Sequence, residues 1–259
     1  MKQRILITGG TGTLGREIVQ QLLEAEREVS VLTSKANPNL PLQAKIYQGD
    51  LTDQSTLHHA VSDAEVIIHC ASNSLDPQNV DIKGTKNLLS AIPKDKLKHF
   101  IYISIVGVDK SEFPYYKAKY EVEKMVEDSG LPYTILRATQ FHDFILHRLI
   151  HTFDKGPCKI MQLPQNMKLQ PIDITEVAEV VIKLTDQSPG NRILSIGGPE
   201  ILPLENMVQV YLEQVGRNEK IELVPMDIFK PFQTGINLCP GDSYGKITWK
   251  EYLSFNLKG

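Results

Sequence analysis

The sequence predicts an α/β protein, with a doubly wound parallel sheet followed by a smaller C-terminal α+β lobe. The first observation is a short apolar run, Ile5–Ile7, followed by glycines at positions 9, 12 and 15 and then by apolar residues at helical spacing. The second is that strand-like and helix-like stretches alternate over the first 140 residues, which is typical of parallel sheets. A chain of 259 residues with 41% hydrophobic content can also bury a sizeable core.

The first half of the chain contains six strand-like stretches, most of them short apolar runs of the kind found in buried parallel strands. In chain order we expect strands over 5–7, 28–33, 44–47, 64–71, 100–104 and 133–136. Between them we expect helices over 16–25, 55–61, 80–92 and 115–129. Gly130 is a plausible C-cap for the last of these helices.

The second half of the chain is less regular. We expect a helix over 141–153, extended runs from Cys158 to 163 and over 168–174, and a strand over 191–196. Two more helices are expected over 175–185, with Thr175 or Asp173 as its N-cap, and over 204–215. A last strand over 221–224 precedes a tail rich in proline and glycine that contains the sole tryptophan, Trp249.

The three glycines lie between a predicted strand and a predicted helix, the order found at phosphate-binding corners. Gly9 permits a tight turn, Gly12 lets a ligand approach the backbone, and Gly15 lets helix and strand pack closely. The backbone N–H groups of Thr13, Leu14 and Gly15 then lie at the helix start, where the helix dipole favours a pyrophosphate. An ordinary turn is the alternative, but this position favours dinucleotide binding.

The end of the second strand indicates which dinucleotide binds. A site selective for NAD usually places an acidic residue there, about 20 residues beyond the glycines, to hold the ribose hydroxyls. This chain has Thr33, Ser34 and Lys35 instead. Ser34 and Lys35 can bind a 2′-phosphate, so NADP(H) is favoured over NAD(H). The alternative for Lys35 is a solvated loop residue.

Two further loops at strand ends are expected to line the cofactor. Asp50 and Leu51 follow the third strand, where Asp50 can accept a hydrogen bond from the adenine amino group or only cap a turn. Asp53 is the better N-cap for the next helix, which leaves Asp50 for the ligand. Three residues at the carboxyl end of the fourth strand are expected beside the second ribose: Cys70, Ala71 and Ser72.

Tyr115 and Lys119 lie four residues apart near the start of a predicted helix, a spacing that puts both side chains on one face. A nearby ammonium would lower the pKa of the phenol, so that Tyr115 can exchange a proton with a carbonyl or alcohol. The same lysine can bond the nicotinamide ribose. Such a pair also arises by chance, so its place after the fifth strand carries the argument.

Four motifs occur together in this chain: Thr8-Gly9-x-x-Gly12-x-x-Gly15, Gly49-Asp50-Leu51, Gly84-Thr85-x-Asn87-Leu88-Leu89 and Tyr115-x-x-x-Lys119. This set resembles the extended and atypical short-chain dehydrogenase/reductases. Three further runs resemble the NmrA-like NAD(P)-binding branch: Ser129-Gly130-Leu131-Pro132-Tyr133-Thr134-Ile135-Leu136-Arg137, Gln170-Pro171-Ile172-Asp173-Ile174 and Gly197-Gly198-Pro199-Glu200. The resemblance implies a Rossmann domain over 1–140 and a substrate lobe over 141–259, of which about 170–198 returns to the Rossmann domain.

The resemblance also implies catalysis by Tyr115 and Lys119 with a serine after the fifth strand. Ile105 stands in the expected place of that serine, and Ser104 is one position earlier. Neighbours on a strand point to opposite sides, so Ser104 faces either the sheet or the nicotinamide. We keep Ser104 as a candidate for both catalysis and cofactor binding. Gln140 and His142, after the sixth strand, are candidates to contact carboxamide or substrate.

Composition limits the partners. A net charge of −3 gives no reason to expect nucleic acid or a membrane surface, and three widely spaced cysteines read as free thiols in the cytoplasm. His147 and His151 have i, i+4 spacing, but Arg148 stands where a zinc protease needs glutamate, so no metal is expected. We expect a monomer or a homodimer that binds a small-molecule substrate.

Three functions are compatible with these residues. The first is an NAD(P)H-dependent oxidoreductase acting on a small carbonyl or quinone-like substrate. The second is a non-catalytic protein of the NmrA kind that senses NAD(P) and acts through a partner. The third and most remote is a nucleotide-sugar epimerase or dehydratase, which the short C-terminal lobe and the missing serine disfavour.

Overall fold

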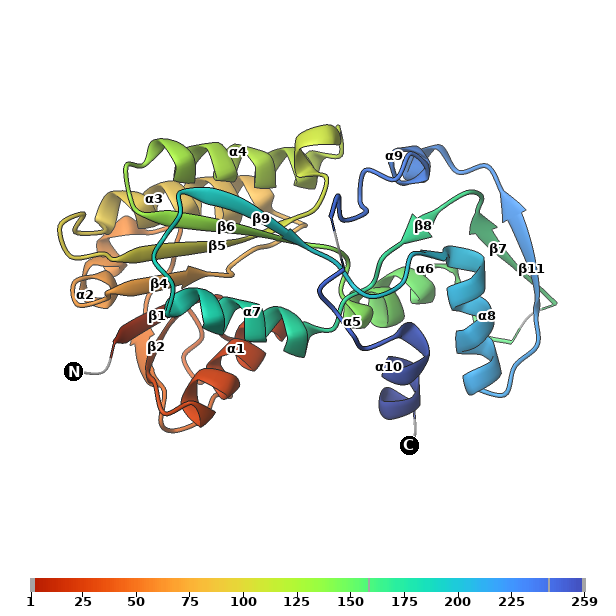
Figure 1. Cartoon of the computed structure of the whole chain (residues 1–259), viewed down its shortest axis with the longest axis horizontal. Coiled ribbons are helices and arrows are strands. Elements are labelled where there is room, and N and C mark those ends of the chain that lie inside the picture. Colours follow the sequence, from red (N-terminus) through yellow and green to blue (C-terminus); the bar gives the residue numbers. More distant parts are fainter. Residues whose placement is uncertain (1–2, 158, 242, 258–259) are drawn as a thin grey trace. The chain divides into compact units, whose positions relative to one another are not determined.

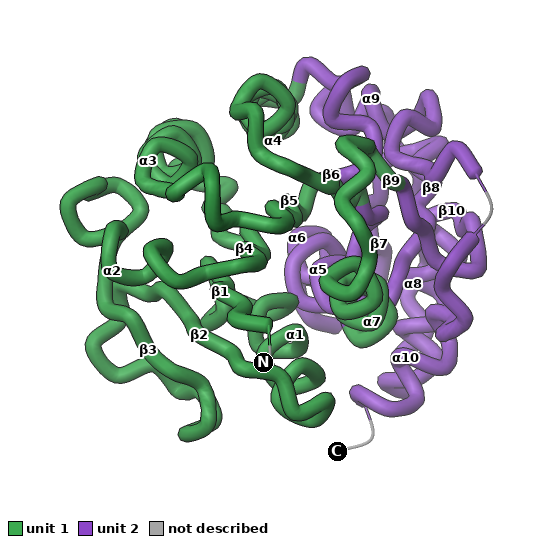
Figure 2. Tube along the Cα trace, turned by 60° about the vertical axis from the view of Figure 1, so that its left-hand side comes forward, with its two compact units in different colours: residues 1–104, 113–137, 175–194 green, residues 105–112, 138–174, 195–259 purple. Residues whose placement is uncertain are grey.

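The structure, a computed structural model, describes residues 3–157, 159–241 and 243–257. The chain divides into two compact units (Figure 2). The first, unit 1, comprises residues 1–104, 113–137 and 175–194, and the second, unit 2, comprises residues 105–112, 138–174 and 195–259. Each unit is therefore assembled from three stretches of sequence.

A seven-stranded sheet forms the centre of unit 1, in the order β3-β2-β1-β4-β5-β6-β9 (Figure 1). Neighbouring strands from β3 to β5 pair in parallel, which confirms the predicted doubly wound sheet. The strands are β1 (Arg4–Thr8), β2 (Glu28–Thr33), β3 (Lys45–Gln48), β4 (Val66–His69), β5 (His99–Ile105), β6 (Tyr133–Ala138) and β9 (Arg192–Ile196). The order reverses direction between β1 and β4, and open α/β sheets bind ligands at such a reversal.

Helices cover both faces of this sheet: α1 and α7 lie on one face, and α3 and α4 on the other (Figures 1 and 2). Their bounds are α1 (Thr13–Glu24), α3 (Gly84–Ala91), α4 (Pro114–Asp128) and α7 (Ile174–Thr185), with the short helices η1 (Gln54–Thr56) and α2 (His58–Val61) and the π-helical turn η2 (Gln78–Lys83). Buried apolar side chains fill the space between the sheet and α3 and α4, among them Ile67, Phe100, Leu88 and Val122.

Unit 2 combines two small sheets with short helices. Strand β7 (Ile160–Pro164) pairs in parallel with β11 (Lys220–Val224), and β8 (Lys168–Leu169) pairs antiparallel with β10 (Leu202–Pro203). Its helical segments are η3 (Val108–Lys110), α5 (His142–Phe144), η4 (Ile145–Ile150), α6 (His151–Phe153), α8 (Leu204–Gln214), η5 (Asp227–Phe229), α9 (Lys230–Gln233) and α10 (Trp249–Asn256). Trp249 is 1% exposed in the core of this unit, and its indole N–H donates to the Met207 carbonyl at 2.9 Å.

Three details differ from the expected elements. Helix α7 begins at Ile174, so of the two N-cap candidates Thr175 lies inside the helix, whereas Asp173 directly precedes it. Helix α4 ends at Asp128 with Ser129 as its C-cap, and Gly130, the expected C-cap, follows with φ +72°, a conformation that glycine adopts at little cost. The expected proline- and glycine-rich tail forms α9 and α10, and Cys158, expected to start an extended run, lies outside the described residues. Within the part of the chain that the structure describes, every helix is too short or too polar to cross a membrane.

Candidate functional site

The loops that follow β1 and β4 lie against each other at the carboxyl edge of the sheet. The backbone N–H of Cys70 donates to the Thr8 carbonyl at 3.1 Å. A Cβ added to Gly9 would lie 2.5 Å from the Ala71 nitrogen, and Gly9 has φ +71°. The structure thus requires glycine at position 9, both for its backbone conformation and for the close approach of the second loop.

Residues 9–15, the glycine corner, form a turn that is closed by a backbone hydrogen bond. The Gly12 N–H donates to the Gly9 carbonyl at 2.9 Å. A Cβ on Gly15 would lie 2.2 Å from that same carbonyl oxygen, so helix α1 can pack this closely only with glycine there. In the structure Gly9 permits the tight turn and Gly15 permits the close packing of α1, as expected.

The N-terminus of α1 offers donors for an anion. Gly12 is the N-cap and has no side chain to accept from the first helical turn. As the first three helical residues, Thr13, Leu14 and Gly15 have no carbonyl of their own helix within reach of their N–H groups. These donors and the helix dipole together can hold a phosphate group. The arrangement fits the pyrophosphate of a dinucleotide.

Arg16 is a residue that the sequence reasoning missed. Its guanidinium donates to the Thr11 carbonyl and to the Asn39 carbonyl, both at 3.0 Å, and so joins the glycine loop to the loop after β2. Ser34 and Lys35 are exposed at the start of that second loop. The signal in the sequence was an arginine directly after the third glycine, but its partner Asn39 is 23 residues away.

The carboxylate of Asp50 stabilises a turn by hydrogen bonding to Thr52. One of its carboxylate oxygens accepts the Thr52 N–H and the Thr52 hydroxyl, each at 2.8 Å. Asp53 caps the short helix η1 through the Ser55 N–H, as expected. The Leu51 carbonyl accepts from the Asn87 amide at 2.8 Å, which ties this loop to α3. A contact from Asp50 to adenine stays a prediction.

Tyr115 lies in the first turn of α4, half-buried, with its phenol oxygen 2.7 Å from the Ser72 hydroxyl oxygen. Ser72 in turn donates to Asp81 Oδ1 at 2.6 Å. Burial raises the pKa of Tyr115 to about 12; the hydrogen bond with Ser72 opposes this shift and the negative charge of Asp81 adds to it. The expectation that Lys119 lowers this pKa was wrong, because the phenol faces Ser72 and Asp81.

Lys119 is buried one turn further along the same helix. Its ammonium donates to the Ile103 carbonyl at 2.7 Å, lies 3.9 Å from Asp81 Oδ1 and stands 4.4 Å from the centre of the Tyr102 ring. Burial lowers its pKa to about 8, against the opposing influence of Asp81. Asp81 thus contacts Lys119 directly and Tyr115 through Ser72, although the sequence reasoning did not single it out.

The Ser104 hydroxyl bonds a partner other than Tyr115 or Lys119. Its hydroxyl is buried and donates to Glu123 Oε1 at 2.5 Å, and Glu123 forms a bidentate ion pair with Arg137 at 2.9 and 2.6 Å. Because the single hydroxyl proton of Ser104 is directed to Glu123, Ser104 can act toward a further partner only as an acceptor in this arrangement, and its expected roles beside Tyr115 or the nicotinamide stay predictions. Ile105, the next residue, is half-buried.

His69, at the end of β4, and Cys70, directly after it, are both kept uncharged at neutral pH. His69 is fully buried between the Thr8 hydroxyl at 2.6 Å and the Thr85 hydroxyl at 2.9 Å. Burial, with a smaller effect of the Lys119 charge, lowers its pKa to about 3, so the imidazole is neutral. Burial raises the pKa of the Cys70 thiol to about 12. Both residues therefore support the site rather than carry charge in it.

The candidates after β6 lie in unit 2 and are buried. Gln140 donates to the Asn237 carbonyl at 3.3 Å. The ring of His142 stacks on Tyr252 at 4.8 Å between centroids, and its Nδ1 lies 3.6 Å from Asp173 Oδ2. Over the described residues, no three histidine, cysteine or acidic side chains gather in a way that could hold a metal ion.

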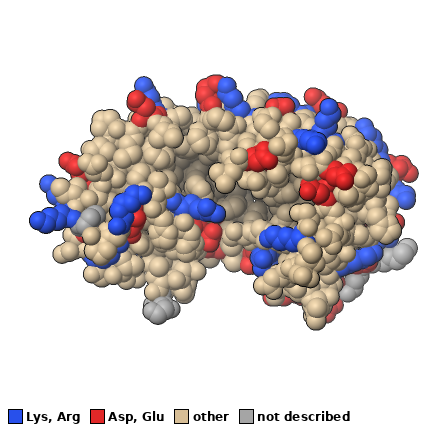
Figure 3. All heavy atoms as spheres, turned by 180° about the vertical axis from the view of Figure 1, so that it is seen from behind, with Lys and Arg blue, Asp and Glu red and all other residues tan. Residues whose placement is uncertain are grey.

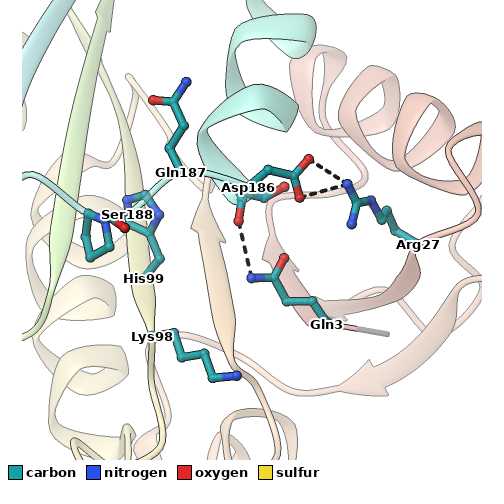
Figure 4. A pocket seen from close by; sticks show the side chains of 9 residues that line it. Gln3, Arg27, Lys98, His99, Asp186, Gln187 and Ser188 are labelled. Atoms are coloured by element: carbon teal, nitrogen blue, oxygen red, sulfur yellow. Dashed lines mark hydrogen bonds and ion pairs between the residues drawn. The ribbon is translucent and has the colours of Figure 1, made fainter. Parts of the chain in front are cut away.

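A separate pocket lies at the opposite edge of the sheet, where strands begin (Figure 4). Gln3 precedes β1 and donates to the Thr185 carbonyl at 3.2 Å, and Arg27 pairs with Asp186 at 2.6 Å. Parallel α/β sheets bind their ligands at the carboxyl ends of the strands, so this pocket is a poor candidate. On the face shown in Figure 3, basic and acidic side chains are interspersed.

The fold and the glycine corner define a class: a dinucleotide-binding Rossmann protein of the atypical short-chain dehydrogenase/reductase type. The sequence matches the NmrA-like family over residues 1–240. The chain therefore belongs to the NmrA-like family, an NAD(P)-binding branch of that superfamily, which confirms the resemblance drawn from the motifs.

Several known proteins are similar to this chain. The photosystem II assembly factor Ycf39 of Cyanophora paradoxa is 28% identical over 232 residues, which cover 86% of this chain and 72% of that protein. The NADPH complex of the quinone oxidoreductase QOR2 from Escherichia coli has a TM-score of 0.82 at 17% identity, covering 98% and 100% of the two chains. The Citrobacter sp. triphenylmethane reductase complexed with NADP(H) gives 0.82 at 17%, covering 97% and 99%. At such identities, the two structures establish the fold alone.

Proposed function

We propose that this protein is an NADPH-dependent oxidoreductase that reduces a small carbonyl or quinone-like compound, with Tyr115 as the proton donor. The observation that carries the proposal is the position of the Tyr115 phenol, hydrogen-bonded to Ser72 beside the loop that packs on Gly9. The names of two structural neighbours, a quinone oxidoreductase and a triphenylmethane reductase, are those of reductases. When bound, the cofactor would supply hydride.

The residues of the chain would bind the cofactor and handle the proton. The N–H groups of Thr13, Leu14 and Gly15 would hold the pyrophosphate, and the loop at Cys70 and Ala71 would run beside the second ribose. Because the pKa of Tyr115 is raised to about 12, the phenol keeps its proton at neutral pH until an acceptor oxygen gains negative charge.

The preference for NADP(H) over NAD(H) would come from three side chains. Ser34 and Lys35 directly follow β2, at the position where an acidic residue would repel a 2′-phosphate. Arg16 adds a guanidinium that already bridges the two loops on either side of that position. Arginine binds phosphate through two parallel hydrogen bonds, which gives it geometric selectivity as well as charge.

The test is to measure turnover of Tyr115→Phe with NADPH and a panel of carbonyl compounds and quinones. We expect turnover to fall at least a hundredfold, because general acid catalysis contributes about 10²–10⁴-fold, while the dissociation constant of NADPH stays within about twofold. Tyr120→Phe, on the same helix but away from Ser72, serves as the matched control. Undiminished turnover in Tyr115→Phe would show that the phenol is not the donor.

One observation favours a second function, a non-catalytic protein that binds NAD(P) and acts through a partner. Ser104 is committed to Glu123, and Ile105 stands where the resemblance places a serine, so the expected catalytic set is incomplete. The relative from Cyanophora paradoxa is named an assembly factor. Tight NADPH binding without turnover of any compound in the panel would favour this function over the reductase.

A further inference from the structure

Three residues from separate elements form one hydrogen-bonded chain in unit 1: Tyr115 in α4, Ser72 after β4, and Asp81 in η2. The phenol oxygen lies 2.7 Å from Ser72 Oγ, which lies 2.6 Å from Asp81 Oδ1. The other carboxylate oxygen of Asp81 accepts the Asn73 N–H at 3.0 Å. The loop after β4 is therefore held to η2 at two points by a single carboxylate.

Proton counting fixes the direction of this chain. Asp81 accepts from Ser72 and Asn73 and faces the Lys119 ammonium at 3.9 Å, which are the partners of an ionised carboxylate. A carboxylate can only accept, so the single hydroxyl proton of Ser72 is directed to Asp81. The hydroxyl oxygen of Ser72 is then an acceptor toward Tyr115, and the phenol must donate.

The burial of Asp81 shows that this arrangement is built into the fold. Asp81 is 1% exposed, and a buried carboxylate is strongly unfavourable unless charged and polar groups surround it. Ser72, by contrast, is exposed and Tyr115 is half-buried, so the chain runs from a buried charge to the surface where a substrate would arrive. The Tyr115 phenol is therefore hydrogen-bonded to Ser72 and not to Ser104, which is bonded to Glu123.

We propose that Asp81, acting through Ser72, is the residue that positions the Tyr115 phenol for proton donation, an inference that rests on the proposed reductase function. When a substrate binds, the phenol O–H turns from Ser72 to the substrate oxygen, and this O–H bond breaks as the proton passes to that oxygen, which leaves a phenolate. The Ser72 hydroxyl then turns from Asp81 to donate to that phenolate. The negative charge of Asp81 is still balanced by the Lys119 ammonium. Because Ser72 is exposed, a solvent water returns the proton to Tyr115 and the hydroxyl turns back.

The two positioning residues affect Tyr115 in opposite directions. The charge of Asp81 raises the pKa of the phenol, and the hydrogen bond with Ser72 lowers it, because the Ser72 hydroxyl turns to donate once the phenolate forms. The other titratable groups that the charge of Asp81 influences are Lys119 from α4 and Tyr102 from β5. Lys119 is also influenced by Glu123 and Cys70, and its own charge acts on His69. All of them remain in Asp81→Asn and in Ser72→Ala, so each variant changes one link of the chain.

The experiment measures the pKa of Tyr115 in the full chain without substrate. The protein is labelled with fluorotyrosine and titrated by fluorine NMR, and the Tyr115 signal is the one missing from Tyr115→Phe. We expect Asp81→Asn to lower this pKa and Ser72→Ala to raise it. Asp76→Asn, the same substitution at a residue that bonds the Asn79 amide, is the control and should not move it. Shifts of the same sign in the first two variants, or none, would overturn the inference.

Kinetics with NADPH and 1,4-benzoquinone separate this inference from the function beneath it. We expect kcat of Asp81→Asn and Ser72→Ala to fall at least tenfold, with the NADPH dissociation constant within about threefold and with the pH dependence of kcat displaced in opposite directions. Normal kcat in both variants overturns the role of Asp81 and leaves the reductase intact. No turnover by the wild-type protein, with the NMR shifts present, overturns the reductase and with it the catalytic role.

Discussion

Arg16 is the residue on which the proposed preference for NADP(H) depends most directly. Its guanidinium donates hydrogen bonds to two backbone carbonyls from two different loops. A 2′-phosphate arriving between those loops would meet a cation whose side chain is already ordered. Less conformational entropy is then lost on binding than with a mobile lysine.

Arg16→Gln should weaken NADPH binding at least tenfold and change NADH binding less than threefold, because only NADPH carries the second phosphate. Fluorescence titration of each cofactor gives both dissociation constants. Arg148→Gln, at an exposed position in unit 2, is the matched control. Equal losses for the two cofactors would show that Arg16 only holds the loops together, and a wild-type preference for NADH would contradict the cofactor proposal.

Residue spacing predicted part of the candidate site and could not predict the rest. The positions of Tyr115 and Lys119 on one helix follow from a spacing of four, and the glycine roles follow from a strand and a helix that flank them. Residue spacing does not predict which residue bonds the Tyr115 phenol. Ser72 and Asp81 are 43 and 34 residues from Tyr115, so only the folded sheet brings the three together. For the same reason, the bond from Ser104 to Glu123 could not be read from the strand alone.

Among the elements, α10 is the one that the sequence signals most clearly and that our reading missed. Thr248 and Glu251 form a capping box: the Thr248 hydroxyl accepts the Glu251 N–H, and the Glu251 carboxylate accepts the Thr248 N–H at 2.9 Å. Such a pair, three residues apart before an apolar run, is a helix-start signal. The prolines and glycines earlier in the tail masked it. By contrast, β8 and β10 are two residues each, too short for any periodicity to reveal.

Thr248→Ala should lower the free energy of unfolding by about 1 kcal/mol, because it leaves a first-turn N–H without its acceptor. Urea denaturation followed by Trp249 fluorescence measures this, since Trp249 is the first residue of the helix. Thr248→Ser, which keeps the hydroxyl, should lie within a few tenths of a kcal/mol of the wild type. A loss of equal size in both variants would mean that the methyl group of Thr248, rather than its hydroxyl, supports the helix.

At the scale of the whole molecule, three strands connect the two units through the chain itself. The chain leaves unit 1 at Ile105 in β5, at Ala138 in β6 and at Ser195 in β9, and it returns to unit 1 at Phe113 and at Thr175. Unfolding of unit 2 would therefore release the ends of three strands of the unit 1 sheet. The alternation of strands and helices predicted the sheet, but this interleaving depends on which segments of the irregular second half return to it.

We expect the two units to unfold together. In urea, Trp249 fluorescence reports unit 2 alone, because Trp249 is the sole tryptophan and is buried there, whereas far-UV circular dichroism reports both units. The two transitions should share one midpoint within experimental error, which is the usual sign of a single cooperative transition. A fluorescence transition at clearly lower urea than the dichroism transition would show that unit 2 unfolds separately.

Cys70 lies beside the glycine corner, and its raised pKa of about 12 has a consequence for signalling. Peroxides and disulfides react with the thiolate, and at neutral pH this thiol is almost wholly in its protonated form. Cys70 is therefore a poor target for such oxidants at neutral pH. If the protein senses redox state through this corner, the information must arrive as the ratio of reduced to oxidised dinucleotide, with the corner reading which form is bound.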